Sequence, residues 1–164
     1  ILKITLVLTV RDTRPPLRRW LVPQLRRLAF RAGVRRGTIS IALVSDACMR
    51  QLHARYKGVR GTTDVLTFDL RESAASPAAP LEADLVICRD VAVRQARRHG
   101  HAARLEVLLY ALHGLLHLIG YDDRTEAHFR TMHRLEDQLL VAAGFKPLFQ
   151  ALRRNVWVNR RWAG

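Results

Sequence analysis

Hydrophobic and polar residues alternate over the first ten residues of the chain. Positions 2, 4, 6, 8 and 10 are all apolar, while Lys3, Thr5 and Thr9 fall between them. A period of two with one apolar face is typical of a half-buried strand. The pattern therefore predicts a first strand over residues 2–10.

The next stretch changes from a period of two to the spacing of a helix. Four leucines recur three or four residues apart, with arginines on the other side: Leu17, Leu21, Leu25 and Leu28. This predicts an amphipathic helix. Pro23 lies inside it and is expected either to kink the helix or to mark its true start.

Three further short runs of apolar residues predict strands, at 38–44, 64–68 and 84–88. The last run is continuous enough to be buried on both faces of a sheet. Between the second and third of these runs, residues 71–81 form an Ala/Ser/Pro stretch without periodicity, which predicts a loop.

Four more helices are predicted from apolar spacing and capping residues, at 45–56, 91–99, 102–119 and 125–143. Ser45 or Asp46 would cap the first of them. The 102–119 helix is hydrophobic nearly all round, which marks it as central and buried. The sequence thus predicts an α/β domain over residues 1–144, in which about five helices surround a small mixed sheet of about four strands.

Residues 145–164 form a separate basic and aromatic extension. Arginines there are interleaved with aromatic residues: Arg153, Arg154, Arg160 and Arg161 with Phe149, Trp157 and Trp162. Such a mixture suits phosphate contact with base stacking. It equally suits an extra helix that packs through its tryptophans, so both interpretations stay open.

The central helix carries the strongest chemical signal. His113 and His117 stand four residues apart, so both imidazoles project from nearly the same face. Gly120 ends the helix, and Asp123 can turn back to the same point. Three ligands with room left for water describe an open, catalytic metal site.

Two observations favour a metal over the alternative of two hydrogen-bonded core histidines. Two unpartnered imidazoles on an otherwise apolar helix are costly to bury. Gly114 also sits between them in mid-helix at a cost of about 1 kcal/mol relative to alanine, which suggests close approach of another backbone.

The spacing HxxxHxxGxxD is also that of metzincin proteases. Those enzymes place glutamate directly after the first histidine as the general base. Here that position is Gly114, so peptide hydrolysis by that mechanism would lack its proton acceptor. The metalloprotease interpretation is therefore disfavoured. The other histidine pairs, His99 with His101 and His128 with His133, are expected at the surface or in packing roles.

The charge of the chain points to a polyanionic partner. There are 28 Lys and Arg residues against 14 Asp and Glu, for a formal net charge of +14, and only Lys3, Lys57 and Lys146 are lysines. Arginine pairs with phosphate through a planar fork of donors, so nucleic acid is the favoured partner. The alternative is an arginine-rich proteome, which implies no partner.

Cysteine usage and hydropathy indicate a cytoplasmic protein. Cys48 and Cys88 are the only cysteines, and they read as small buried core residues in a reducing compartment, with no disulfide. No apolar run is long enough for a transmembrane helix, and Ile1–Val10 lacks the features of a signal peptide.

The segment from His113 to Asp123 resembles the signature HGxLHLxGYDH of the YbeY family, metal-dependent endoribonucleases that mature bacterial ribosomal RNA. The resemblance extends to Tyr56-Lys57 followed by 63–68, which is similar to the family's YR…PTDVLSF block, and to 84–88, which is similar to its GDIVIC strand. Met132 and Glu136 resemble its final-helix pattern. These blocks lie in family order up to about residue 144.

This resemblance implies a single-strand-specific endoribonuclease that acts in ribosomal RNA maturation and ribosome quality control, through attack of metal-activated water on a phosphodiester. It implies one Zn²⁺ ion, with Mn²⁺ or Ni²⁺ as alternatives, held by His113, His117 and Asp123. The implied partners are RNA, in particular the small-subunit precursor, and the ribosome or its proteins. No membrane is implied.

Two positions depart from the family pattern. The third ligand, a histidine in the family, is Asp123 here, which is anionic and a harder ligand. The family's active-site arginine is Lys57 here, and either Lys57 or Arg60 would contact phosphate and stabilise the transition state. Because no general base is evident, an alternative is a ribosome-associated RNA-binding factor with a structural metal and little catalysis.

Overall fold

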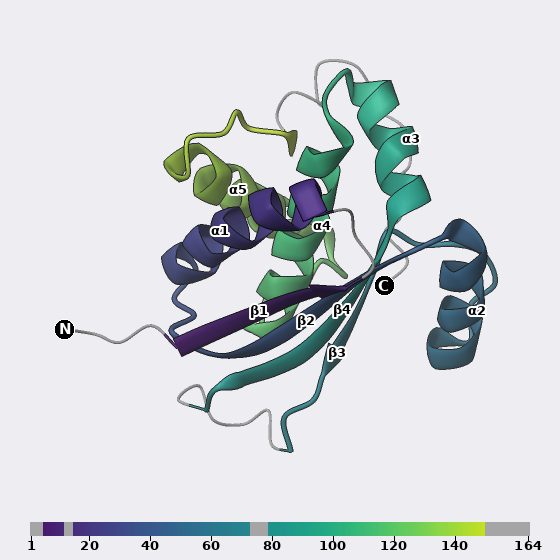
Figure 1. Cartoon of the computed structure of the whole chain (residues 1–164), viewed down its shortest axis with the longest axis horizontal. Helices are drawn as coiled ribbons and strands as arrows, with labels where there is room; N and C mark the ends of the chain where they lie inside the picture. The colour runs from purple at the N-terminus through teal and green to yellow at the C-terminus, as the bar shows by residue number, and fades with distance from the viewer. Residues whose placement is uncertain (1–4, 12–14, 73–78, 150–164) are drawn as a thin grey trace.

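A four-stranded mixed sheet forms the base of the molecule (Figure 1). In this computed structural model, residues 5–11, 15–72 and 79–149 are described. The strands are β1 (Thr5–Arg11), β2 (Arg36–Val44), β3 (Val65–Asp69) and β4 (Leu81–Cys88), in the order β1-β2-β4-β3. β1, β2 and β4 are parallel, and β3 runs antiparallel to β4. The predicted sheet is confirmed; residues 2–4 of the predicted first strand lie outside the described residues.

Five helices complete the described part of the chain: α1 (Pro15–Arg31), α2 (Asp46–Lys57), α3 (Arg89–His99), α4 (Ala103–Leu118) and α5 (Glu126–Ala142). In Figure 1, α1, α4 and α5 lie together on one side of the sheet, whereas α2 stands apart from them on the right. The predicted α/β class and the approximate number of elements are therefore confirmed.

Helix α4 lies at the centre of the molecule, as its apolar sequence predicted. It packs against β3, β4 and all of α1, α3 and α5. Its side chains are buried on nearly every side, and Leu108, Leu112 and Leu115 are fully inaccessible to solvent. A helix that is surrounded by other elements is apolar on all of its faces, because none of them contacts water. Any polar residue on α4 therefore needs a specific partner, which makes its histidines informative.

Helix ends follow the capping residues of the sequence. Ser45 accepts a hydrogen bond from the Cys48 N–H at the start of α2, and Thr125 accepts one from the His128 N–H at the start of α5. Pro23 does not mark the start of its helix, because α1 begins at Pro15 and continues through it to Arg31. Pro15 suits the first turn of α1, because backbone N–H groups there have no partner inside the helix and proline lacks this group.

Two expectations about burial need correction. Along the 84–88 segment of β4, Leu85 and Ile87 are fully buried, but Asp84 and Val86 are only half-buried, so the strand is not covered equally on both faces. Cys88 is buried as expected, whereas Cys48 is half-buried. Both cysteines are free. Among the described residues, no helix combines the length and hydropathy needed to cross a membrane.

The first residues of the C-terminal extension pack on the domain. Leu148 is buried, and the ring of Phe145 meets Trp20 of α1 edge-on at 6.2 Å. The Phe149 N–H donates to Asp137 of α5 at 2.9 Å. The arginines and tryptophans on which the two interpretations of the extension depend belong to residues 150–164, outside the described residues.

Gly114 is required by close packing, although not by the backbone approach that the sequence suggested. A Cβ at this position would lie 2.8 Å from Leu85 Cδ2 and 2.9 Å from Thr67 Oγ1, so side chains of β4 and β3 make the close approach. The absence of a side chain lets α4 sit directly on the sheet.

We expect Gly114→Ala to destabilise the protein by about 1 kcal/mol, measured by urea denaturation. Overpacking costs about 1–3 kcal/mol, and the gain in helix propensity offsets about 1 kcal/mol of it. A Leu85→Ala background removes one of the two close contacts, so the same change should cost less there than in the wild type. Equal destabilisation in both backgrounds would contradict this explanation.

Candidate metal centre

The turn after α4 brings the chain back to the helix that it has just left. The Gly120 N–H donates to the His117 carbonyl at 3.1 Å, and the Tyr121 N–H donates to the Leu116 carbonyl at 3.0 Å. Gly120 has φ +101°, in the left-handed region that favours glycine. These paired bonds form the Schellman motif that commonly ends helices. The motif reverses the chain and returns Asp123 toward the last turns of α4.

The structure brings the three predicted ligands together. The Nε2 atoms of His113 and His117 are 3.0 Å apart. The carboxylate of Asp123 lies 3.6 Å from His113 Nε2 and 3.8 Å from His117 Nε2. A tetrahedral ion with bonds of about 2.0–2.2 Å would hold its ligand atoms about 3.4 Å apart. The observed separations bracket this value.

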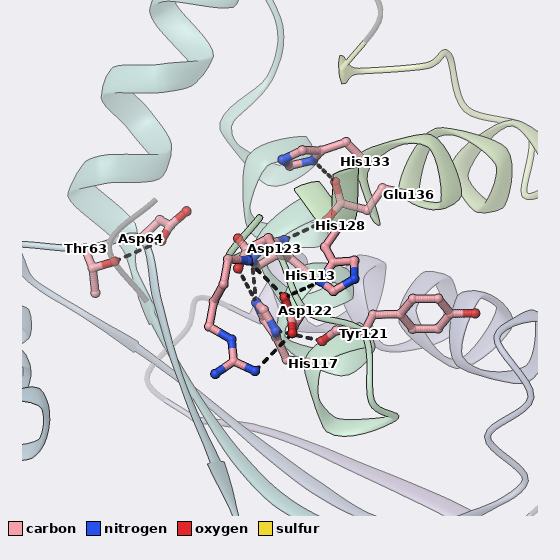
Figure 2. A network of polar contacts seen from close by, with 11 residues as sticks. Thr63, Asp64, His113, His117, Tyr121, Asp122, Asp123, His128, His133 and Glu136 are labelled. Carbon is pink, nitrogen blue, oxygen red and sulfur yellow. Dashed lines mark hydrogen bonds and ion pairs between the residues drawn. The ribbon is translucent and has the colours of Figure 1, made fainter. Parts of the chain in front are cut away.

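Hydrogen bonds fix the orientation of both imidazole rings (Figure 2). His113 Nδ1 lies 2.7 Å from Glu136 Oε1 on α5. His117 Nδ1 lies 3.0 Å from the Tyr121 carbonyl oxygen, within the turn itself. Because a carbonyl can only accept, His117 Nδ1 carries the hydrogen. Partners of this kind, a carboxylate and a backbone carbonyl, are those that orient metal-binding histidines.

The tautomers that follow from these bonds fit a bound cation. With hydrogen on Nδ1 of both rings, the two Nε2 lone pairs point at each other across 3.0 Å, beside a carboxylate. Three acceptors facing one point repel one another unless a positive charge sits among them. Two imidazoles and a carboxylate suit a divalent transition metal such as zinc, nickel or iron.

The charges around His113 favour a positive charge at this position. Burial alone would lower the pKa of His113, but the hydrogen bond to Glu136 and the charges of Glu136, Asp64 and Asp123 raise it. Burial would likewise raise the pKa of Glu136, but hydrogen bonds from His113 and His133 hold it below its usual value. The pKa of His117 is lowered by burial and by the neighbouring charge of His113.

Glu136 joins the metal centre to α5 and to the C-terminal extension. Its second oxygen lies 2.5 Å from His133 Nδ1, so one buried carboxylate bridges two buried histidines. The ring of His133 stacks on Phe149 at 4.1 Å with an interplanar angle of 6°. The sequence marks Glu136 only through its resemblance to the family's final-helix pattern. Its contact with His113 depends on the packing of α5 against α4, which spacing along the chain does not reveal.

We expect Glu136→Gln to weaken metal binding about 10-fold and Glu136→Ala up to about 100-fold, the range found when outer partners of ligating histidines are removed. Glutamine keeps an acceptor for His113 but loses the negative charge, so the two variants separate charge from orientation. Equilibrium dialysis of the metal ion measures both, and an unchanged affinity in the alanine variant would contradict the role assigned to Glu136.

Lys57 and Arg60, the predicted phosphate contacts, are exposed at the end of α2 and in the loop that follows. This loop leads to Asp64, a buried carboxylate whose charge acts on His113. Burial raises the pKa of Asp64, and its Oδ2 atom has no hydrogen-bond partner among the described residues. The loop thus approaches the metal centre, while the roles of Lys57 and Arg60 stay predictions.

One basic residue near the centre was not singled out from the sequence. Arg71 follows β3, and its guanidinium donates to the Leu118 carbonyl at the end of α4 at 2.9 Å while it also pairs with Asp69. No motif marks Arg71, so only the tertiary structure places it at the end of α4, next to the candidate ligand His117.

The remaining histidines differ in their surroundings. His128 is exposed and His133 is buried in packing, as expected. The expectation that His99 and His101 lie at the surface is wrong, because both are half-buried and contact the buried carboxylate of Glu106. That carboxylate is seven residues before His113 on α4, and no spacing in the sequence marks it as their partner.

The packing around Gly114 also bears on the protease interpretation. A Cβ there would already meet the side chains of Leu85 and Thr67, so any larger residue would require these side chains to shift. Gly114 itself cannot supply the general base of the metzincin mechanism, which agrees with the sequence argument against a metalloprotease.

Comparisons with known proteins point to one family. Residues 11–144 match the family model described as endoribonuclease YbeY. Relatives that carry the same name include proteins from Frankia alni, 38% identical over 63% of this chain, from Moorella thermoacetica, 36% identical over 66%, and from Anaeromyxobacter, 44% identical over 65%. The matches span 62%, 74% and 54% of these relatives, so the chain spans less than two thirds of two of them.

A solved structure shares the fold. The solution structure of a protein from Thermotoga maritima superposes with a TM-score of 0.55 at 19% sequence identity. The superposition covers 96% of this chain and all of that one. At this identity the likeness concerns the architecture alone, and it agrees with the sheet and helices described above.

Proposed function

The chain belongs to the YbeY family of endoribonucleases, and on that premise we propose that it is a metal-dependent endoribonuclease that hydrolyses phosphodiesters in single-stranded RNA. The observation that carries the proposal is the convergence of His113, His117 and Asp123 on one point. Both imidazoles are oriented by hydrogen bonds at Nδ1, the ring nitrogen that faces away from this point. Three protein ligands leave a fourth coordination position of a tetrahedral ion for water or substrate, which suits catalysis rather than a closed structural role.

The residues of the centre have separate tasks in this proposal. His113, His117 and Asp123 would hold the ion, which we propose to be Zn²⁺. When bound, such an ion supplies Lewis acidity, which activates water and polarises a phosphoryl oxygen. Glu136 and the Tyr121 carbonyl keep the two imidazoles in the binding tautomer. Asp64 adds a buried negative carboxylate near His113 when it is ionised.

Positive charge elsewhere on the chain would bind the RNA. The formal net charge of +14 strongly favours a phosphate backbone as partner. Lys57 and Arg60 are exposed on the loop that leads toward the centre, where they would contact the phosphate and stabilise charge that develops in the transition state. Lysine offers a point charge, whereas Arg60 offers the bidentate fork that matches phosphate.

The biological setting follows from the family. We propose that the substrate is ribosomal RNA, as a small-subunit precursor, that the protein acts in ribosomal RNA maturation and ribosome quality control, and that it works in the cytoplasm in contact with the ribosome. Mn²⁺ and Ni²⁺ remain alternatives to Zn²⁺, because imidazole and carboxylate ligands accept all three.

A second candidate function is favoured by one observation. Gly114 stands where a metalloprotease has its general base, and it has no side chain to serve as one. A protein without a general base could serve as an RNA-binding assembly factor of the ribosome, in which the metal only ties α4 to its returning turn.

Incubation of the purified protein with end-labelled single-stranded RNA and with the matching duplex separates these candidates. The nuclease proposal predicts internal cleavage of the single strand, little cleavage of the duplex, and loss of cleavage when a chelator is added. Binding of single-stranded RNA with no chelator-sensitive cleavage under Zn²⁺, Mn²⁺ or Ni²⁺ would overturn it in favour of the assembly factor.

A further inference from the structure

A second cluster of metal-ligating side chains lies at the junction of α3 and α4. His99 is the last residue of α3, His101 lies in the turn after Gly100, and Glu106 is in the first turn of α4. His99 Nδ1 is 2.7 Å and His101 Nε2 is 3.2 Å from the same oxygen, Glu106 Oε1. One ligand atom from each residue lies within 4.8 Å of the others.

The position of this cluster is set by the turn between the helices. Gly100 has φ +70°, and the left-handed conformation there ends α3 and folds His101 back beside His99. The two rings lie 5.6 Å apart, centroid to centroid. Both side chains are half-buried, with 12% and 18% of their surface exposed, so an ion could reach them from solvent.

The hydrogen bonds of His101 leave an unfavourable contact that a cation would relieve. His101 Nδ1 lies 3.3 Å from the Ala102 carbonyl oxygen, which can only accept, so Nδ1 carries a hydrogen. The other ring nitrogen, Nε2, faces Glu106 Oε1, a second acceptor, at 3.2 Å, so a proton or a metal ion is needed between these two atoms.

The Glu106 carboxylate adds a second reason for a positive charge. Only 2% of its surface is exposed, and a buried carboxylate requires charge compensation. A metal ion bonded to this carboxylate and to both imidazoles would satisfy the carboxylate and His101 Nε2 together. It would replace the proton between His99 Nδ1 and Glu106 Oε1, and these two atoms would move apart from 2.7 Å to about 3.4 Å, the separation of the ligand atoms around a tetrahedral ion.

We propose that His99, His101 and Glu106 form a second metal site, for a divalent transition metal of the zinc and nickel class. Two imidazoles and a carboxylate are the donors that such ions prefer. Mg²⁺ prefers an octahedral shell of oxygen ligands, so two imidazoles and one carboxylate disfavour it. The nitrogen ligands therefore determine which metal binds.

The second site is aligned with the first along the central helix. Glu106 precedes His113 by seven residues, which corresponds to about 10 Å along α4 and to nearly the same face. The two ions would thus lie about two helical turns apart, too far to share one substrate oxygen. The second site is independent of the proposed nuclease activity, since metal binding there needs no RNA.

Metal stoichiometry tests this inference directly. Tag-free protein is stripped of metal, dialysed against Zn²⁺, and analysed for zinc per chain. We expect two ions in the wild type, one in Glu106→Gln, one in His113→Ala and none in the double variant. Glutamine still accepts a hydrogen bond from His99, so the fold should persist, and we expect zinc affinity at the second site to fall at least about 100-fold in this variant.

A second variant shows whether a loss of zinc results from misfolding. His101→Ala changes a half-buried turn residue and should also bind one zinc ion, with an unchanged thermal transition of the metal-free protein. One ion in the wild type that is lost in His113→Ala would overturn the inference, as would two ions retained in both Glu106→Gln and His101→Ala. Neither result depends on RNA cleavage, so failure here is distinguishable from failure of the nuclease proposal.

Discussion

His113→Ala is expected to remove the metal from the first site and to lower RNA cleavage at least about 100-fold, while RNA affinity changes by less than about threefold. In the proposed site His113 would supply a buried ligand, and its loss also leaves Glu136 without one of its two histidine partners. Even outer partners of ligating histidines contribute 10–100-fold to affinity or activity, so a ligand should contribute more.

RNA affinity should survive because it depends on the basic surface and not on this side chain. Metal analysis, cleavage rate and RNA binding are measured on the same preparation. His128→Ala provides the matched control, because it removes an exposed histidine that is not among the three ligands. Loss of RNA binding at unchanged metal content would contradict the assignment of His113.

Substitutions of Asp123 should show whether this residue acts as a metal ligand or only through its negative charge. Asp123→Ala should lower zinc affinity at least about 100-fold, because it removes the only carboxylate among the three ligands. Asp123→His should retain zinc, since imidazole is an equally good ligand for it. It should also shift the preference away from Mn²⁺, for which carboxylate oxygen is the better ligand.

Competition between Zn²⁺ and Mn²⁺ measures this shift, and Asp122→Ala is the matched control. Asp122 is the neighbouring carboxylate, but it pairs with Arg124 and His128 instead of facing the two ligating histidines. An Asp123→Ala variant that binds zinc as tightly as the wild type would contradict the three-ligand site, whatever the activity of the variant.

The sequence predicts the helices and strands of this fold well, because the patterns that determine them involve residues close together in the chain. The alternation that predicted β1, the serine and threonine caps of α2 and α5, and the glycine after α4 act within a few residues of themselves. The strand order β1-β2-β4-β3 did not follow from the sequence, because it depends on which apolar faces meet in space.

Part of the candidate site can likewise be predicted from nearby residues, and part depends on tertiary packing. Helical spacing and a turn glycine predict the three candidate ligands, which lie within eleven residues of sequence, and the family resemblance supports them. Glu136 is 23 residues from His113, and its partnership depends on how α5 packs on α4. Gly114 was correctly marked as unusual, but its cause lies in Leu85 and Thr67 of the sheet.

No third ligand stands at a regular spacing from His99 and His101, so the sequence predicts surface positions for them, and this prediction fails. His99 and His101 meet Glu106 because a left-handed glycine joins two helices there. A buried carboxylate in the first turn of an apolar helix is the signal that could have revealed their partner.

Add-back of metal to stripped protein tests the nuclease account most directly. Metal-free wild-type protein and metal-free His113→Ala are each mixed with single-stranded RNA, before and after addition of Zn²⁺. We predict that the metal-free wild type is inactive, that zinc restores internal cleavage to it, and that zinc does not restore cleavage to His113→Ala. Equal cleavage by the metal-free and the reloaded wild type, or by His113→Ala and the wild type, would contradict the account.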